Sequence, residues 1–355
     1  MLWAVIMAGG FGTRFWPESR RERPKQFLRF FGPKTLVEAT ADRLRGLLPS
    51  ARTLVVTQAD KVPLVRKTLT KIPRSQVWGE PAGRNTAPCA ILAASWIAQR
   101  DPDGVLALLP ADHHIKRVPA FRRALRSAAR AAAVTGLPVT FGIRPACAHT
   151  GYGYLETGKP VRLPGAGTFR ALKRFCEKPA LGLAKKYVRS GRYLWNSGMF
   201  VWKASALLAA ARKYLPKAYA LAQKITAGDF ASRMKKDFAN MPSISIDYGL
   251  MEKLRGRILA LPSDFGWSDL GSWTSFAELC RRDGAGNVAC GKTLFAESEG
   301  NIVRSGTGRL VALLGAKGMV VVDTPDVLLV CAKERTESIR QVVAALRGPD
   351  LARYR

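Results

Sequence analysis

Short apolar runs alternate with longer amphipathic stretches through most of the chain. Four apolar runs predict buried strands: Leu2–Met7, Thr53–Thr57, Val105–Leu109 and Val139–Ile143. Helical spacing of apolar residues predicts helices at Thr35–Leu48, Thr86–Ala98 and Ala120–Val134. This alternation is typical of βαβ units, in which a mostly parallel sheet has helices on both faces. Ligands bind such sheets beyond the carboxyl ends of the strands, so site residues are expected in the loops that follow strands.

The pattern changes near Asp283, where glycines separate short runs of β character. Such spacing predicts a small all-β domain that winds in the manner of a left-handed β-helix. A final helix is expected near Thr336, because the apolar residues that follow recur at helical spacing. We therefore predict an α/β protein with a larger N-terminal domain at residues 1–280 and a C-terminal β domain with a terminal helix at residues 281–355.

Composition and charge limit the class of protein. The 355 residues include 57 Lys and Arg against 26 Asp and Glu, a formal net charge of +31. With 47% hydrophobic and 23% charged residues, the chain can bury a large core, which excludes a disordered protein. Its apolar stretches are shorter than the roughly 18 residues that cross a membrane. The surplus charge keeps a nucleic-acid-binding protein open as an alternative, although no known binding module accompanies it.

Six cysteines are scattered along the chain, and none forms a Cys-x-x-Cys pair. Zinc sites need close spacing, and disulfide frameworks usually occur in short secreted chains. We therefore interpret the cysteines as reduced thiols in a cytoplasmic protein. They are Cys89, Cys147, Cys176, Cys280, Cys290 and Cys331.

A glycine-rich loop follows the first predicted strand and leads into a basic segment. Its residues of interest are Gly9, Gly10, Gly12, Thr13 and Arg14, with Lys25 further on. Glycines allow backbone N–H groups to close around phosphate oxygens, and basic side chains neutralise the remaining charge. The loop predicts a triphosphate site, and the alternative is an ordinary turn before a solvated basic face. It matches neither the dinucleotide fingerprint nor the P-loop.

A formal P-loop match does occur at Gly286–Thr293. The mechanism of that motif needs a strand before it and a long helix after it. Here the preceding segment, 276–282, has helical character, and the following segment, 294–300, is short and ends in glycine. We interpret the match as accidental.

Asp112 follows the predicted strand Val105–Leu109 and so lies at the mouth of the sheet. Mg²⁺ prefers oxygen ligands and often takes only one or two carboxylates, with phosphates and water completing its shell. Asp112 is therefore a candidate metal ligand, and a helix N-cap is the alternative. His113 and His114 lack a third ligand at suitable spacing, so we expect local hydrogen bonding from them instead of a zinc site.

Three later segments carry further candidates. Glu177 and Lys178 stand just before a helix that begins with proline, Asn196 stands in an aromatic turn that contains glycine, and Asp269 stands between aromatic residues. Carboxylates and amides suit sugar hydroxyls, a lysine suits a sugar phosphate, and Asp269 could be a second metal ligand. Each of these residues is also compatible with an ordinary cap or turn.

Together these motifs resemble the mannose-1-phosphate guanylyltransferases, a family of the sugar nucleotidyltransferase superfamily. The matching segments occur in the family's order from end to end. They are Gly9–Phe27, Glu80–Pro88, Pro110–Ile115, Thr150–Glu156, Glu177–Pro179, Trp195–Trp202, Ser245–Lys253 and Trp267–Trp273. The Phe-Trp-Pro-Glu-Ser continuation after Arg14 resembles the guanylyl enzymes more than their thymidylyl or adenylyl relatives. A related enzyme with another base or hexose is the alternative.

The resemblance implies a Rossmann-like nucleotide-diphospho-sugar transferase domain and the reaction of GTP with mannose 1-phosphate to give GDP-mannose and diphosphate. It implies catalytic roles for Arg14, Lys25, Asp112 and Asp269, of which Asp112 and Asp269 would bind Mg²⁺. The implied nucleotide-binding residues are Gly9, Gly10, Gly12, Thr13, Arg14, Lys25, Asn85 and Asp112, with Glu80 and Pro81 near the base or ribose. The implied sugar-phosphate-binding residues are Gly151, Tyr152, Gly153, Glu177, Lys178 and Asn196.

Longer members of the family add a C-terminal phosphomannose isomerase domain, and we expect that activity to be absent here. Gly249 replaces a small apolar residue of the family, and we expect it to add flexibility. The expected partners are the two substrates, without specific nucleic acid or membrane. A homodimer is the working expectation for the assembly, which the sequence leaves open.

Overall fold

The computed structural model describes residues 1–355 and divides into two compact units, which are described separately. Unit 1 comprises Met1–Gly9, Glu38–Ala111 and Ile115–Trp267, and unit 2 comprises Gly10–Val37, Asp112–His114 and Ser268–Arg355. The chain therefore passes between the units several times. Two short strands, β5 (His114–Ile115) and β11 (Trp267–Ser268), each include one of these passages.

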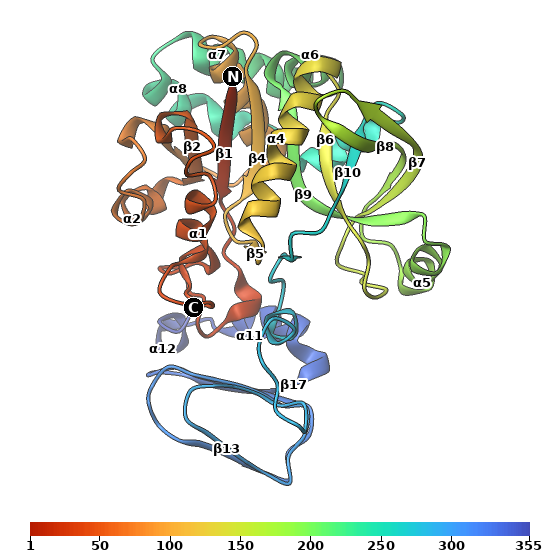
Figure 1. Cartoon of the computed structure of the whole chain (residues 1–355). Coiled ribbons are helices and arrows are strands. Elements are labelled where there is room, and N and C mark those ends of the chain that lie inside the picture. Colours follow the sequence, from red (N-terminus) through yellow and green to blue (C-terminus); the bar gives the residue numbers. More distant parts are fainter. The chain divides into compact units, whose positions relative to one another are not determined.

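Unit 1 is built around a nine-stranded sheet (Figure 1). Its strands are β1 (Leu2–Ala8), β2 (Thr53–Gln58), β3 (Val77–Glu80), β4 (Val105–Pro110), β6 (Val139–Ile143), β7 (Tyr154–Leu163), β8 (Gly167–Cys176), β9 (Tyr193–Lys203) and β10 (Leu259–Ser263). Their order is β3-β2-β1-β4-β9-β6-β10-β8-β7. Strands β3, β2, β1 and β4 pair in parallel, whereas β9 runs antiparallel to both β4 and β6. The sheet is mixed, as predicted, but more of it is antiparallel than predicted, because β9 enters between β4 and β6 in the opposite direction.

Helices cover both faces of this sheet. They are α1 (Leu36–Asp42), which begins in unit 2, α2 (Val62–Thr68), α3 (Thr86–Ala98), α4 (Val118–Thr135), α5 (Leu181–Ser190), α6 (Ala204–Tyr214), α7 (Pro216–Ala227), α8 (Phe230–Asp237) and α9 (Ile246–Gly249). Trp3 and Val5 of β1 share one buried cluster with residues of α3, α6 and α7. Phe121 of α4 packs instead against Phe141 and Phe265, with ring centroids 6.4 and 5.5 Å apart, and Figure 1 shows α4 in front of β4. Short 3₁₀ helices complete the unit: η3 (Ser50–Arg52), η4 (Ala59–Lys61), η5 (Arg74–Gln76), η6 (Phe238–Asn240) and η7 (Met251–Lys253).

Two sequence predictions in this unit were wrong in detail. The helix predicted over Thr35–Leu48 ends at Asp42, where Arg122 donates hydrogen bonds to the carbonyl groups of Asp42 and Arg43 at 3.1 and 2.8 Å. The Asn196 segment is part of strand β9 and not a turn. Gly198 takes a positive φ of 69° within β9, and the register against β6 shifts between Thr140 and Gly142, so the segment is an irregular strand.

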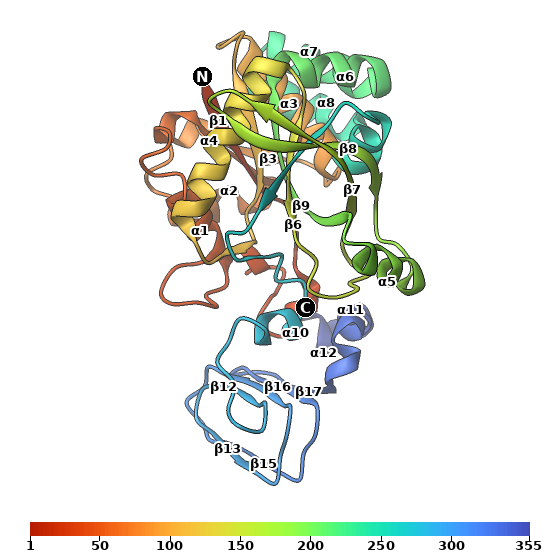
Figure 2. The same cartoon turned by 45° about the vertical axis from the view of Figure 1, so that its right-hand side comes forward.

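Unit 2 contains the basic N-terminal loop and a coil of short strands (Figure 2). Its elements are η1 (Thr13–Phe15), η2 (Lys25–Phe27), α10 (Trp273–Ala277), β12 (Val288–Cys290), β13 (Thr293–Ala296), β14 (Ile302–Ser305), β15 (Val311–Leu314), β16 (Met319–Asp323), β17 (Leu328–Ala332), η8 (Lys333–Ser338), α11 (Ile339–Ala345) and α12 (Pro349–Ala352). Strands β12, β14 and β16 pair in parallel, as do β13 and β15, so successive turns of the chain stack.

Buried asparagines join the stacked turns of the coil. Asn301 is fully buried, and its Nδ2 donates to Oδ1 of Asn287 at 3.0 Å. The backbone N–H of Met319, one turn further on, donates to Oδ1 of Asn301 at 2.8 Å. Because these amides satisfy buried backbone groups, they fix the spacing of the turns. The predicted coil is confirmed.

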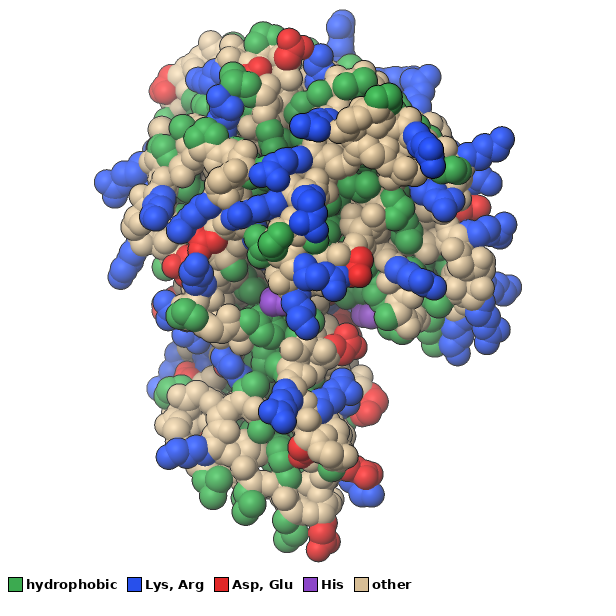
Figure 3. Space-filling model, viewed as in Figure 1, with side chains coloured by type: hydrophobic (Ala, Val, Ile, Leu, Met, Phe, Trp, Pro, Cys, Tyr) green, Lys and Arg blue, Asp and Glu red, His purple; other side chains and the backbone are tan.

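No helix in the structure is both long and apolar enough to span a membrane. Lys and Arg side chains are spread over the visible surface instead of forming a single patch (Figure 3).

Candidate functional site

The glycine-rich loop follows β1 and is shaped around Lys25. Gly12 has a positive φ of 67°, and a Cβ placed there would collide with Cβ of Lys25. The backbone N–H of Lys25 donates to the carbonyl oxygen of Phe11 at 3.2 Å, and that of Phe15 donates to Gly12 at 2.9 Å. Only glycine meets both the conformation and the space at position 12. The loop and Lys25 therefore form one local structure.

Lys25 joins two of the sequence-predicted residues within unit 2. Its Nζ lies 2.7 Å from Oδ2 of Asp112 and 2.6 Å from the backbone carbonyl oxygen of Asp269. The Lys25 side chain is only 7% exposed, whereas that of Asp112 is 35% exposed. Burial by itself would raise the pKa of Asp112, but the charges of Lys25 and His113 and the hydrogen bond from Lys25 hold it below its usual value. Asp112 is therefore an anion at neutral pH.

Arg14 reaches the same segment from the glycine-rich loop. Its Nη1 donates to the carbonyl oxygen of Gly271 at 3.2 Å, and its Nε lies 2.9 Å from Oε2 of Glu337. Gly271 in turn donates its N–H to Oδ1 of Asp269 at 3.1 Å, and a Cβ at Gly271 would lie 2.8 Å from Oδ2 of Asp269. Arg14, Lys25, Asp112 and Asp269 are thus brought together, and we call these four residues the Lys25 cluster.

The Lys25 cluster suits a hard divalent cation. Asp112 and Asp269 both carry carboxylates, the ligands that Mg²⁺ prefers. Asp269 reaches Lys25 through its backbone carbonyl oxygen, and its Oδ1 accepts from the N–H of Gly271. No three His, Cys, Asp or Glu side chains converge as a complete metal centre, so phosphate oxygens or water would have to fill the rest of the shell. No helix begins at Asp112, which excludes the N-cap alternative. The ring of neighbouring His114 packs on Phe31, with centroids 4.4 Å apart.

A second group of predicted residues lies in unit 1 around Glu177, which follows β8. Oε1 of Glu177 lies 3.3 Å from Nζ of Lys178, whereas Oε2 is buried without a hydrogen-bond partner. A Cβ at Gly153 would collide with that oxygen, so only glycine leaves it room. Burial raises the pKa of Glu177, against the lowering effect of Lys178. An unpaired buried carboxylate oxygen is costly and is the kind of group that a ligand hydroxyl would satisfy.

Asn196 is held in place by several hydrogen bonds. Its backbone N–H donates to Gly153 at 2.8 Å, and its Oδ1 accepts from Oγ1 of Thr140 at 3.1 Å. Its Nδ2 donates to Oδ1 of Asp247 at 3.1 Å. Burial and the charge of Glu177 raise the pKa of Asp247 to about 7. We call Gly153, Glu177, Lys178, Asn196 and Asp247 the Glu177 cluster.

Sequence reasoning missed Asp247 as a member of this cluster. The residue lies in the Ser245–Lys253 segment, which was noted only for its resemblance. An acidic residue in a matched motif was the available signal, but its neighbour Asn196 is 51 positions away, and only the folded chain brings them together.

Tyr152 directly precedes Gly153 in the sequence, and its side chain belongs to a group of aromatic rings. Its ring stacks on His149 at 3.9 Å and lies 5.0 Å from the ring of Trp195. Nδ1 of His149 accepts from the backbone N–H of Gly151 at 3.0 Å. The predicted Gly151–Gly153 turn is therefore in contact with both His149 and Trp195.

Asn85 and Glu80 lie in unit 1, where the sequence places a base or ribose contact. Asn85 caps α3, since its Oδ1 accepts from the N–H of Thr86 at 2.9 Å, and its φ of 64° is unusual for a residue other than glycine. Glu80 ends β3 and is 7% exposed, and burial raises its pKa to about 8. Contacts of these residues with a nucleotide stay a prediction.

Gly249 and the formal P-loop match have structural explanations. Gly249 lies buried in the last turn of α9, and a Cβ there would lie 2.9 Å from Cδ1 of Leu215. The residue therefore lies close to Leu215, and the expected gain in flexibility stays a prediction. The Gly286–Thr293 segment contains β12 and runs into β13 without a helix, which confirms that the P-loop match is accidental.

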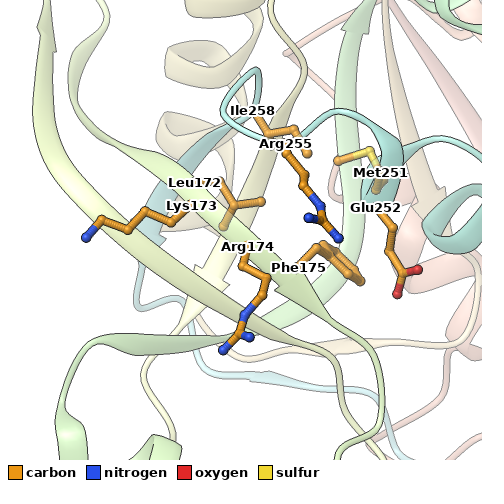
Figure 4. Close-up of a pocket in the computed structure, with 8 residues that line it drawn as sticks. All are labelled: Leu172, Lys173, Arg174, Phe175, Met251, Glu252, Arg255 and Ile258. Carbon is orange, nitrogen blue, oxygen red and sulfur yellow. The ribbon is translucent and has the colours of Figure 1, made fainter.

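A separate cavity of about 120 Å³ lies in unit 1 along β8 (Figure 4). Phe175, Met251, Glu252 and Arg255 are among its lining residues, and none of the sequence-predicted site residues is. The negative charge of Glu252 nevertheless contributes to raising the pKa of Glu177. The cavity is therefore lined by residues outside the two clusters.

Known protein families and relatives match this sequence over nearly the whole chain. Residues 3–285 match the family described as Nucleotidyl transferase, and residues 291–346 match the MannoseP isomerase/GMP-like beta-helix domain. The xanthan biosynthesis protein XanB of Xanthomonas campestris pv. campestris (strain B100) is 38% identical over 97% of this chain and 73% of its own length. Mannose-1-phosphate guanylyltransferase 2 of Escherichia coli O157:H7 is 38% identical over 99% of this chain and 74% of its own length.

A solved structure gives the same result. The crystal structure of mannose-1-phosphate geranyltransferase from Thermus thermophilus superposes with a TM-score of 0.87 and 34% identity, covering 98% of this chain and 99% of that one. The chain belongs to the nucleotidyl transferase family and is a nucleotidyltransferase with a C-terminal β-helix-like domain. Within that class, the resemblance to the mannose-1-phosphate guanylyltransferases is confirmed.

Proposed function

We propose that the protein transfers the guanylyl group of GTP to mannose 1-phosphate, giving GDP-mannose and diphosphate. The observation that carries this proposal is the buried ammonium group of Lys25, held between the Asp112 carboxylate and the Asp269 carbonyl group. Relatives named mannose-1-phosphate guanylyltransferase, at 36–38% identity over nearly the full chain, support these substrates.

The reaction needs positioning more than proton transfer. A phosphate oxygen of mannose 1-phosphate attacks the α-phosphorus of GTP, a new P–O bond forms, and the bond to the leaving diphosphate breaks. The attacking oxygen is already anionic at neutral pH, so the protein does not have to supply a general base. Its main task is to bring two polyanions together and hold them in line.

The Lys25 cluster and the glycine-rich loop are proposed to bind the triphosphate. Backbone N–H groups from Gly9 to Thr13 would hold phosphate oxygens, and Arg14 and Lys25 would neutralise charge that grows on the leaving diphosphate. Asn85, with Glu80, would contact the base or ribose.

The Glu177 cluster is proposed to bind the sugar phosphate. The unpaired Oε2 of Glu177 would accept a hydrogen bond from a mannose hydroxyl, which removes the cost of its burial. The Lys178 side chain, which is 60% exposed and lies 3.3 Å from Glu177, would bind the phosphate, and Asn196 with the Gly151–Gly153 turn would meet the rest of the sugar. Asp247 positions Asn196 by accepting a hydrogen bond from the side-chain amide of Asn196.

Nucleotidyl transferases generally use a divalent metal ion. We propose Mg²⁺, with Asp112 and Asp269 as its protein ligands, because the donor set consists of hard carboxylate oxygens. When bound, such an ion supplies positive charge at the α-phosphate. We further propose a catalytic domain at 1–280, a β domain at 281–355, a cytoplasmic location and a homodimer.

A substrate matrix tests the proposal. The purified full-length chain is incubated with each of four NTPs and with the 1-phosphates of mannose, glucose and galactose, with Mg²⁺ or with EDTA, and released diphosphate is measured. We expect the largest kcat/KM for GTP with mannose 1-phosphate, and no release in EDTA. A clear preference for another pair would favour the related enzyme with a different base or hexose. No diphosphate from any pair would contradict the proposal.

A further inference from the structure

Two cysteine thiols flank a closed turn in unit 2 that has no part in the proposed reaction. Cys280 follows α10, and Cys290 ends β12. Between them the backbone N–H of Asp283 donates to the carbonyl oxygen of Asn287 at 3.0 Å, and the N–H of Asn287 donates to Oδ1 of Asp283 at 2.8 Å. These bonds close the turn three residues from each cysteine, so they bring together the two chain segments that carry the cysteines.

Contacts with Phe276 and Arg304 link the surroundings of the two thiols. Sγ of Cys280 lies 3.4 Å from the carbonyl oxygen of Phe276, and the Arg304 guanidinium lies 5.9 Å from the Phe276 ring centroid. Cys290 is paired with Arg304 in the parallel ladder of β12 and β14. The thiols of Cys280 and Cys290 are hydrogen-bonded to each other, and both residues are half-buried free cysteines.

The surroundings give the two thiols different reactivity. The hydrogen bond from Cys280 and the positive charge of Arg304 lower the pKa of Cys290, against burial and the charge of Glu18. The same hydrogen bond and burial raise the pKa of Cys280. Oε1 of Glu18 lies 2.7 Å from Nε of Arg304, so Glu18 offsets part of the positive charge that Arg304 supplies, but the net effect on the pKa of Cys290 is a lowering. Cys290 is therefore the nucleophilic thiolate, and Cys280 is the thiol that resolves a mixed disulfide.

We propose that Cys280 and Cys290 are a modification site at which a low-molecular-weight disulfide converts the two thiols into an intramolecular disulfide. The Cys290 thiolate attacks one sulfur of the small disulfide and releases one small thiolate. Cys280 then attacks Sγ of Cys290 as its proton leaves, and the second small thiolate departs. Two protein thiols and one small disulfide become one protein disulfide and two small thiols. The bond ties the segment that carries Asp269 and α10 to the first strand of the coil.

Glutathione disulfide is the probe. The reduced full-length protein is incubated with it, free thiols are blocked with N-ethylmaleimide under denaturing conditions, and tryptic peptides are analysed by mass spectrometry without reductant. Cleavage after Arg281 and Arg282 separates the two cysteines into the peptides Ile258–Arg281 and Asp283–Lys292. We expect these two peptides to be joined by a disulfide that dithiothreitol reduces. The oligomeric state of the protein should not change, because the disulfide forms within one chain.

Three variants make the test specific. Cys280→Ser should stop at a glutathione adduct on Cys290. Cys290→Ser should form neither an adduct on Cys280 nor the cross-link. Cys331→Ser should form the cross-link between Cys280 and Cys290 like the wild type. The wild-type peptide map needs no variant to fold. The proposal is overturned if the wild type keeps both thiols free, if the glutathione adduct on Cys290 persists without a cross-link, or if Cys290 pairs with another cysteine.

Discussion

The ammonium group of Lys25 lies 2.7 Å from the Asp112 carboxylate, and this pair connects the glycine-rich loop with the loop after β4. Lys25 is buried, so its charge is compensated by fixed protein groups more than by water. In a low-dielectric setting such a pair is sensitive to the loss of either partner. The pair holds charge in place before any substrate arrives, which is the kind of preorganisation that phosphoryl transfer requires.

Replacing Lys25 tests this pair. Lys25→Ala should lower kcat/KM for GTP by about a hundredfold or more, as the loss of one charge-stabilising group typically does. Lys25→Arg should not restore activity, because the planar guanidinium does not fit the space of a compact ammonium. Lys292→Ala, at an exposed lysine of unit 2, is the control. A kcat/KM for Lys25→Ala within about threefold of wild type would remove Lys25 from the site.

Gly12→Ala tests the close approach of the loop to Lys25. The added methyl group would collide with Cβ of Lys25, and alanine is also strained at a φ of 67°. We expect kcat/KM to fall by about tenfold or more, with a small drop in melting temperature. Gly306→Ala is the matched control, because a Cβ there meets nothing within 4 Å. Equal activity of the two variants would show that the loop tolerates displacement.

Glu177→Gln separates the sugar substrate from the nucleotide. The amide keeps the size of the side chain but removes the charge and replaces one acceptor oxygen by a donor. We expect KM for mannose 1-phosphate to rise about tenfold while KM for GTP changes little. Steady-state kinetics with each substrate varied in turn measures both constants. An equal change in the two KM values, or none, would contradict the assignment of Glu177 to the sugar.

Glu80 predicts a pH dependence of stability. Its pKa is raised by burial from the ordinary value of 4.5 to about 8, so between these pH values the native state keeps a proton that the unfolded state has lost. The free energy of unfolding therefore falls as the pH rises through this window. Glu80→Gln should lose less stability than the wild type between pH 5 and pH 8. Thermal unfolding at both pH values measures this.

The control for this pH series is Glu299→Gln, at a side chain that is 61% exposed. This variant should follow the wild type. If Glu80→Gln also follows the wild type, Glu80 is ionised in the native state at neutral pH and burial does not protonate it.

Local apolar patterns predicted these regular elements well. The strand at Val139–Ile143 and the helix at Thr86–Ala98 have the predicted bounds, and both are apolar runs that are buried over most of their length. The helix at Thr35–Leu48 was too long, because its end depends on Arg122, which is distant in sequence. The antiparallel course of β9 also depends on a tertiary pairing that no local pattern encodes.

For the candidate site as well, local patterns were predictable and tertiary contacts were not. Glycine and charge patterns predicted Arg14, Lys25 and Asp112 as candidates, since a loop after a strand is recognisable locally. The link between Lys25 and the Asp269 carbonyl group spans 244 positions and was not foreseen. Asp247 was missed for the same reason, since only folding brings it into contact with the amide of Asn196.

The transfer itself is tested by following the α-phosphate of GTP. The purified protein is incubated with mannose 1-phosphate, Mg²⁺ and GTP that carries ³²P at either the α or the γ position, and the products are separated by chromatography. We predict that the α label appears in GDP-mannose, that the γ label appears in diphosphate in equal molar amount, and that Lys25→Ala loses both. An α label recovered only in GTP, GDP or GMP, or bound to the protein, would contradict a direct attack of the sugar phosphate on the α-phosphorus.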